Sequence, residues 1–204
     1  MDAFKLQVKI FTDSGAVPTG TSLEDFIPVF HGFIKNHTVK ETLIDVANYA
    51  HVPDGPGVAL IGNGGDYFLD EEKGRAGLIY SRKREAPAPD ARLVDTFRRA
   101  FFVGTLLEKD AAFAGKLKFR TDEILFRVND RLLAPSTDAT LAELRPALDA
   151  FGRILFAGAP FELSRTGSAR EVFGVTFKSA PVSGLSVLLD RLGGTPAPEG
   201  AKAS

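Results

Sequence analysis

One feature constrains the fold of this chain more than any other: the pattern of apolar residues over its first strand and helix repeats 118 positions later, with no gap over the matching stretch. The alternating residues of the first copy and their counterparts in the second are Leu6, Val8 and Ile10, and Ile124, Phe126 and Val128. Each copy continues into a helix, entered at Ser22 or Thr140, that carries a proline near its start. We therefore expect residues shared by both copies to be structural, and residues found in one copy only to be candidates for a function.

The repeated pattern predicts an α+β fold with a mainly antiparallel sheet. Each copy is interpreted as a strand, a helix, a hairpin and a second helix, and two such units would pack about a pseudo-twofold axis. Their sheets would either merge or face each other across a shared helical layer. We expect one compact domain over residues 1–194, with copy one at 3–114 and copy two at 116–194. Residues 195–204 have the small, polar composition of a flexible tail.

Copy one is predicted to contain an insertion near residues 40–65. Two strands, at 42–49 and 58–62, flank a loop whose Pro and Gly residues favour turns. A second hairpin, at 67–70 and 77–84, has its counterpart in copy two at 161–164 and 171–178. The last helix of each copy is expected over 93–107 and 185–192.

Composition removes several functional classes. The chain has 25 Lys and Arg against 26 Asp and Glu, a net charge of −1, so nucleic acid is not an expected partner. Because it contains no Cys, disulfides, a thiolate nucleophile and cysteine-held metal sites are excluded. No stretch approaches the length of apolar sequence that a membrane span needs, and we expect a cytoplasmic protein.

Recognised catalytic motifs are also missing. The sequence has no P-loop, no dinucleotide-binding glycine pattern, no nucleophile elbow and no zinc-protease or EF-hand motif. The glycine-rich segment 62–66 precedes a strand instead of a helix, so it is interpreted as a hairpin turn and not as a phosphate loop. We predict no metal site, and the sequence leaves any cofactor unknown.

The candidate catalytic residues lie in or beside the predicted insertion. A histidine beside carboxylates could act as a general base or as a metal ligand, which would suit a hydrolase or lyase built on Asp45, His51 and Asp54, with or without a divalent metal. The alternative is structural, since Asp54 begins a Gly-Pro-Gly turn and His51 follows a strand end.

The candidate ligand-binding residues are Tyr49, Asn63, Asp66, Tyr67, Arg82 and Arg84. Together with Arg98 and Arg99, the last two could form a basic patch for a phosphate or an acidic partner, or could simply mark a solvated strand end. The segment 129–131 could face a groove between the copies, although its Asn-Asp pair is also typical of a turn.

The element order is similar to that of duplicated strand-helix-strand-strand modules such as the GyrI-like and SOUL-type ligand-binding proteins, although no motif of those families is present. The favoured hypothesis is a non-catalytic protein that binds a small molecule or a partner protein in the cleft between copies or at the insertion. The enzyme at His51 is the first alternative. A structural subunit, including a homo-oligomer, is the second, and it would need an exposed apolar patch, for which helix 91–107 with Phe97, Phe101 and Phe102 is the candidate.

Overall fold

Two strands from distant parts of the chain form the middle of the sheet in the computed structural model, which describes residues 3–52, 55–84, 87–113 and 115–198. Strand β1 (Leu6–Thr12) pairs antiparallel with β6 (Phe119–Val128). Val8 lies directly opposite Phe126, and Leu6 lies opposite Val128. The strands of the first and second halves of the chain therefore merge into one sheet, one of the two arrangements that the sequence allowed.

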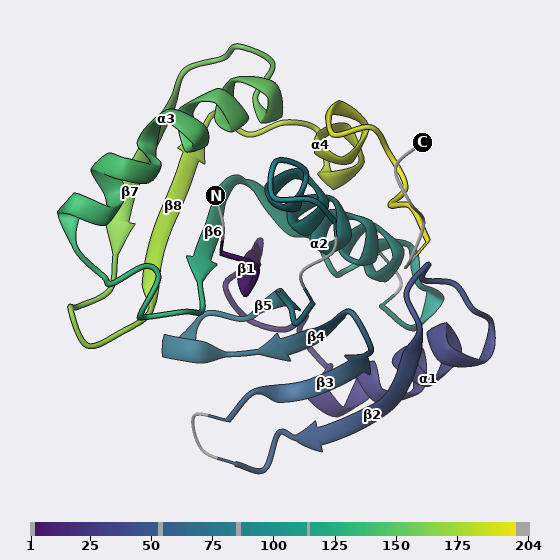
Figure 1. Ribbon diagram of the computed structural model, residues 1–204. Helices are drawn as coiled ribbons and strands as arrows, with labels where there is room; N and C mark the ends of the chain where they lie inside the picture. The colour runs from purple at the N-terminus through teal and green to yellow at the C-terminus, as the bar shows by residue number, and fades with distance from the viewer. Residues whose placement is uncertain (1–2, 53–54, 85–86, 114, 199–204) are drawn as a thin grey trace.

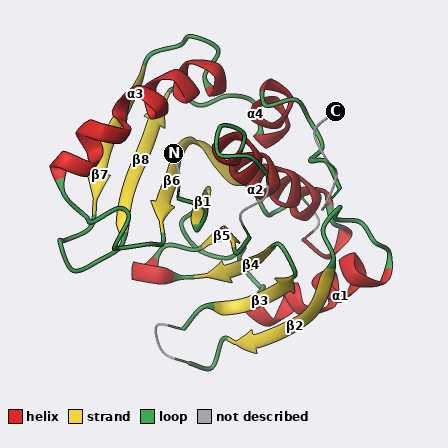
Figure 2. Ribbon diagram, in the orientation of Figure 1, coloured by secondary structure: helices red, strands yellow, loops and turns green. Residues whose placement is uncertain are grey.

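The described strands form one eight-stranded sheet in the order β2-β3-β4-β5-β1-β6-β8-β7, and every neighbouring pair is antiparallel. The remaining strands are β2 (Leu43–Tyr49), β3 (Gly57–Gly62), β4 (Gly65–Asp70), β5 (Gly77–Arg82), β7 (Phe161–Thr166) and β8 (Phe173–Ser179). The α+β class with an antiparallel sheet is confirmed (Figure 2).

Four α-helices are described, and they pack on one side of this sheet. They are α1 (Phe26–Lys35), α2 (Arg92–Lys109), α3 (Asp138–Leu155) and α4 (Leu185–Arg191). Figure 1 shows α2 in the middle, with α4 beside it, α1 near β2 and α3 alongside β7. None of the helices that the structure describes has the length and apolar composition needed to cross a membrane.

Helix α3 begins two residues before the predicted entry at Thr140. The hydroxyl of Thr137 accepts a hydrogen bond from the backbone N–H of Thr140 at 3.2 Å, which makes Thr137 the N-cap. The short 3₁₀ helix that precedes α1, Leu23–Asp25, is closed by a capping box in which Asp25 accepts a hydrogen bond from the backbone N–H of Ser22 at 2.7 Å. The polar cap at Thr137 thus starts α3 earlier than the apolar periodicity indicated.

Aromatic rings join the helices to the sheet at the centre of the core. Phe97 of α2 lies 4.5 Å from Phe151 of α3, 5.6 Å from Phe177 of β8 and 6.0 Å from Phe126 of β6, measured between ring centroids. Phe97 and Phe101 are fully buried. They therefore do not form the exposed patch that the subunit hypothesis placed on this helix.

The opposite face of the sheet carries no α-helix in the described part of the chain and has a different composition. Side chains alternate along a strand, so Lys9 and Phe11 of β1 point away from the helices, as do Leu125 and Arg127 of β6. We call this the open face.

Candidate functional site

The open face carries a groove of about 580 Å³. Its floor consists of side chains from β1, β6, β8 and β7. One wall is the connection between β4 and β5, residues 71–76, here called the β4–β5 loop. The groove also reaches residues 167–172, the β7–β8 loop, and both loops lie at the left of Figure 1. The groove thus lies where the first and second halves of the chain meet.

Ion pairs hold the β4–β5 loop against the second half of the chain. The guanidinium of Arg75 donates two hydrogen bonds to Glu123 of β6, at 3.0 and 2.9 Å. The same guanidinium stacks over the ring of Phe11, 3.7 Å from its centroid. Arg75 lowers the pKa of Glu123 by hydrogen bonding, so this carboxylate stays charged at neutral pH.

The tip of the same loop makes two further ion pairs. Glu72 accepts a hydrogen bond from Arg127 of β6 at 2.7 Å, and Lys73 Nζ lies 2.5 Å from Glu171 Oε1 in the β7–β8 loop. The hydrogen bond from Lys73 lowers the pKa of Glu171 to about 2. Lys73 has a φ of 57°, a conformation that non-glycine residues seldom adopt. The turn that carries this ammonium group therefore has an unusual backbone conformation.

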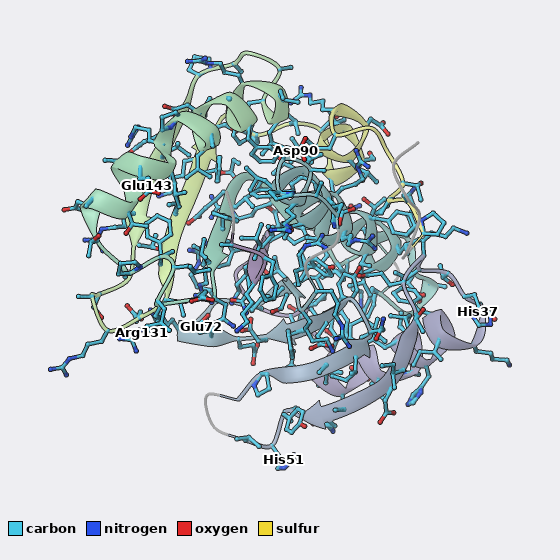
Figure 3. The ribbon with its side chains drawn as sticks, in the orientation of Figure 1. His37, His51, Glu72, Asp90, Arg131 and Glu143 are labelled. Carbon is cyan, nitrogen blue, oxygen red and sulfur yellow. The ribbon has the colours of Figure 1, made fainter. Side chains whose placement is uncertain are left out.

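Cations outnumber carboxylates along the groove. Seven cationic side chains and three carboxylates line the groove. The cations are Lys9, Lys73, Arg75, Arg127, Arg131, Arg170 and Lys178, and the carboxylates are Glu72, Glu123 and Glu171. Within the described parts of the chain, Arg131, Arg170 and Lys178 make no ion pair. Figure 3 labels Arg131 and Glu72, which lie on the same side of the molecule. The groove therefore has an excess of positive charge, and three of its cations are available to a ligand.

Three hydroxyl groups lie on the floor between these cations. Ser164 of β7 is opposite Thr176 of β8, and Thr166 is the next residue on that face of β7. None of the three side chains hydrogen-bonds to another described residue. Thr166 is opposite Gly174, where an added Cβ would lie 2.5 Å from the threonine Oγ1. Glycine thus keeps this part of the floor open.

A second polar cluster is buried between α2 and strands β4 and β5. Glu41, which follows α1, accepts hydrogen bonds from the hydroxyls of Tyr67 and Tyr80, the latter at 3.0 Å. Its Oε1 also lies 3.3 Å from Nη1 of Arg99. The Nε of Arg99 in turn donates to Asp95 at 2.8 Å. This buried network places two tyrosines and an arginine around one carboxylate.

The network continues to Arg82, which donates to the same Asp95 and to the hydroxyl of Thr96. Two arginines thus balance two carboxylates. Burial raises the pKa of Glu41, and Arg99 and the two tyrosines oppose that rise. Burial also raises the pKa of Tyr67 well above its ordinary value. Because each charge has a partner, the network satisfies its buried groups internally.

The C-terminal segment packs against this network. Nη2 of Arg99 donates to the carbonyl of Ala197 at 3.3 Å, and Pro196 is buried. Pro198 and Glu41 border a hollow of about 490 Å³. Residues 199–204 lie outside the described residues, so the flexible tail stays a prediction there.

The predicted ligand-binding residues divide into three groups. Tyr67 and Arg82 belong to the buried network. Arg84 donates to the carbonyl of Asn63 at 3.2 Å, across the turn between β3 and β4. Near that turn, Lys83 Nζ lies 2.8 Å from Asp66 Oδ1. Tyr49 is apart from both groups, at the end of β2, and is 44 % exposed.

The two predicted catalytic residues that the structure describes, Asp45 and His51, lie on β2 and in the turn after it, at one edge of the sheet. Asp45 accepts a hydrogen bond from the backbone N–H of the next residue, Val46, at 2.8 Å. His51 is exposed in the turn after β2, and Figure 3 shows it far from Glu72 and Arg131. Asp54 lies outside the described residues. No group of three acidic or histidine side chains in the described part of the chain is placed to hold a metal ion.

Sequence reasoning missed most of the groove. Of the predicted site residues that the structure describes, none lines it. Two features of the sequence could have pointed to the groove. The first is the segment 129–131, because its Arg131 lines the groove. The second is the rule that residues found in only one copy are candidates for a function. Comparison of the chain with family models, with curated proteins and with solved structures finds no match.

Proposed function

We propose that the protein binds a small anionic molecule in the groove on the open face of its sheet. One observation carries the proposal: Arg131, Arg170 and Lys178 lack an ion pair within the described residues, and all three line the same cavity. Its volume falls in the range of small-molecule sites, which are a few hundred to about 1,000 Å³. A ligand carboxylate or phosphate would find charge-assisted hydrogen bonds there.

The buried floor supports the same proposal. Leu125 and Phe11 supply apolar surface, and Ser164, Thr166 and Thr176 supply hydroxyls that can donate or accept. Ligand sites commonly combine an apolar lining with a few polar groups that fix orientation.

We also propose that the two halves of the chain are related by an approximate twofold axis through the Val8–Phe126 pair. The register of β1 with β6 supports this, because Val8 lies opposite Phe126, its own counterpart in the 118-residue repeat. The neighbour order supports it too: β5 and β4 follow β1 on one side as β8 and β7 follow β6 on the other. The extra strands β2 and β3 would then be the insertion predicted near 40–65.

If the two halves are related in this way, they differ in whether one matching lysine has an ion-pair partner. Tyr80 lies opposite Val8 and Val175 lies opposite Phe126, so Lys83 and Lys178 hold matching places. The ammonium of Lys83 is neutralised by Asp66. The residue that matches Asp66 on β7 is Ser164, so Lys178 has no carboxylate at that position, although its charge helps to lower the pKa of Glu123 and of Asp122. The nearby carboxylates Glu162 and Glu123 make no ion pair with Lys178, and Glu123 is held by Arg75.

Thermal unfolding of the full chain with inorganic phosphate, pyrophosphate or citrate tests the proposal at constant ionic strength. A ligand that binds only the folded state raises its stability by about 2.7 kcal/mol at a hundred times its Kd. We expect at least one of these anions to raise the Tm of the wild type, and the shift to disappear in a Lys178→Ala/Arg170→Ala double variant.

Arg153→Ala is the matched control, because Arg153 is an exposed arginine on α3 and does not line the groove. It should keep the full shift. If no anion shifts the wild type, or if all variants shift equally, the groove is not the binding site.

A further inference from the structure

We infer that the groove selects an elongated molecule with an anionic group at each end. This inference rests on the proposed function and adds the class of ligand to it. It follows from where the cations without an ion pair lie along the strands.

Lys178 marks one end of the groove. It lies on β8 opposite Glu123 of β6 and Glu162 of β7. Thr176 precedes it on the same face, and Gly174 precedes Thr176. Four residues of an extended strand span about 13 Å, so the groove floor continues for roughly that length beyond Lys178.

Arg131 and Arg170 mark the other end. Arg170 is in the β7–β8 loop, which begins after Thr166, the partner of Gly174. Arg131 follows the end of β6 at Val128, which lies opposite Phe173 at the start of β8. Both arginines are therefore separated from Lys178 by the length of the floor.

The surface between the two ends carries no unpaired charge. Ser164, Thr166 and Thr176 offer hydroxyls there, and Leu125 offers an apolar contact. Two cations border this stretch: Arg127 is already held by Glu72, and Lys9, which lies opposite Leu125, is held by Asp70 at 2.7 Å. A ligand with its charges at the ends and a neutral or hydroxylated middle would match this order of groups, whereas a compact anion would reach only one end.

Isothermal titration of the full chain with suberate and octanoate tests the inference, since the two acids have equal chain length but suberate carries a second carboxylate. A hydrogen bond to a charged group corresponds to roughly a ten- to hundredfold change in affinity. We expect suberate to bind the wild type at least tenfold more tightly than octanoate. Succinate, which is too short to reach both ends, should bind no better than octanoate.

The single variants Lys178→Ala and Arg170→Ala should each reduce suberate binding to the level of octanoate, and Arg153→Ala should leave it unchanged. Equal binding of suberate and octanoate, or sensitivity to only one of the two groove variants, would overturn the inference but leave an anion site in place. If phosphate, pyrophosphate, citrate and both organic acids all fail to bind, the proposed function fails as well.

Discussion

Lys73 of the β4–β5 loop and Glu171 of the β7–β8 loop form an ion pair across the groove, with Nζ 2.5 Å from Oε1. The hydrogen bond from Lys73 is the main reason that the pKa of Glu171 falls to about 2. We expect Lys73→Met to return this pKa toward 4.5, as measured by NMR titration of the side-chain carboxyl. An unchanged titration would show that the pair does not persist in solution.

The same pair sets a dependence of stability on pH. The folded pKa of Glu171 lies below its unfolded value, so its contribution is complete above about pH 4.5 and is lost as the pH falls toward 2. The difference in stability between wild type and Lys73→Met should therefore shrink over that window. High salt should also reduce it, because both side chains are substantially exposed.

Glu41 should make the stability of the folded protein depend on pH in the opposite direction to Glu171. Burial raises its pKa, so the folded protein holds this proton more tightly than the unfolded chain. The stability contributed by Glu41 is then complete below about pH 4.5 and decreases as the pH rises through the folded pKa. NMR titration should place the Glu41 carboxyl above 4.5. Tyr67→Phe should raise this pKa further, because the Tyr67 hydrogen bond lowers it. A titration at or below 4.5 would mean that Arg99 and the tyrosines outweigh burial.

Phe97 should be among the residues most important for stability. Its ring contacts Phe101 of its own helix and the rings of Phe126, Phe151 and Phe177, which belong to three other elements, β6, α3 and β8. We expect Phe97→Ala to lower the free energy of unfolding by about 3–5 kcal/mol in urea titrations. Phe102→Ala, on the same helix but half-buried, should cost less. Equal losses would contradict the central position of Phe97.

Two helical glycines should respond to alanine in opposite directions. An added Cβ at Gly152 of α3 would lie 2.4 Å from atoms of the Phe161 ring, whereas at Gly32 of α1 it would meet nothing within 4 Å. Gly152→Ala should destabilise the protein by about 1–3 kcal/mol through overpacking. Gly32→Ala should stabilise it by up to about 1 kcal/mol, through helix propensity. Urea titration of both variants checks the contrast, and stabilisation by Gly152→Ala would be inconsistent with the packing described.

Much of the fold could be predicted because its signals are local. The alternation of Leu6, Val8 and Ile10, and the helical spacing around Phe97, depend only on neighbours in the sequence. The start of α3 was missed because apolar periodicity begins later than its polar cap at Thr137. The merging of the sheets was left open, since it depends on β1 pairing with β6 across more than a hundred residues.

The groove could not be predicted for a similar reason. The sequence predicts a hairpin with strands at 67–70 and 77–84, and nothing in the residues between them indicates that Arg75 reaches Glu123 or that Lys73 reaches Glu171. The candidates around His51 were chosen for their residue types, and an exposed turn contains such residues for its own structural reasons.

The position of β1 between β5 and β6 has a consequence during synthesis. While the ribosome is still translating the second half, the edge of β1 that will later receive β6 has no partner within the chain. Unpaired strand edges recruit strands from other molecules. The nascent first half would therefore expose a templating surface, with Val8 at its centre, until residue 128 has emerged from the exit tunnel. Slow translation through this interval would favour aggregation of the nascent protein, and chaperone capture there would prevent it.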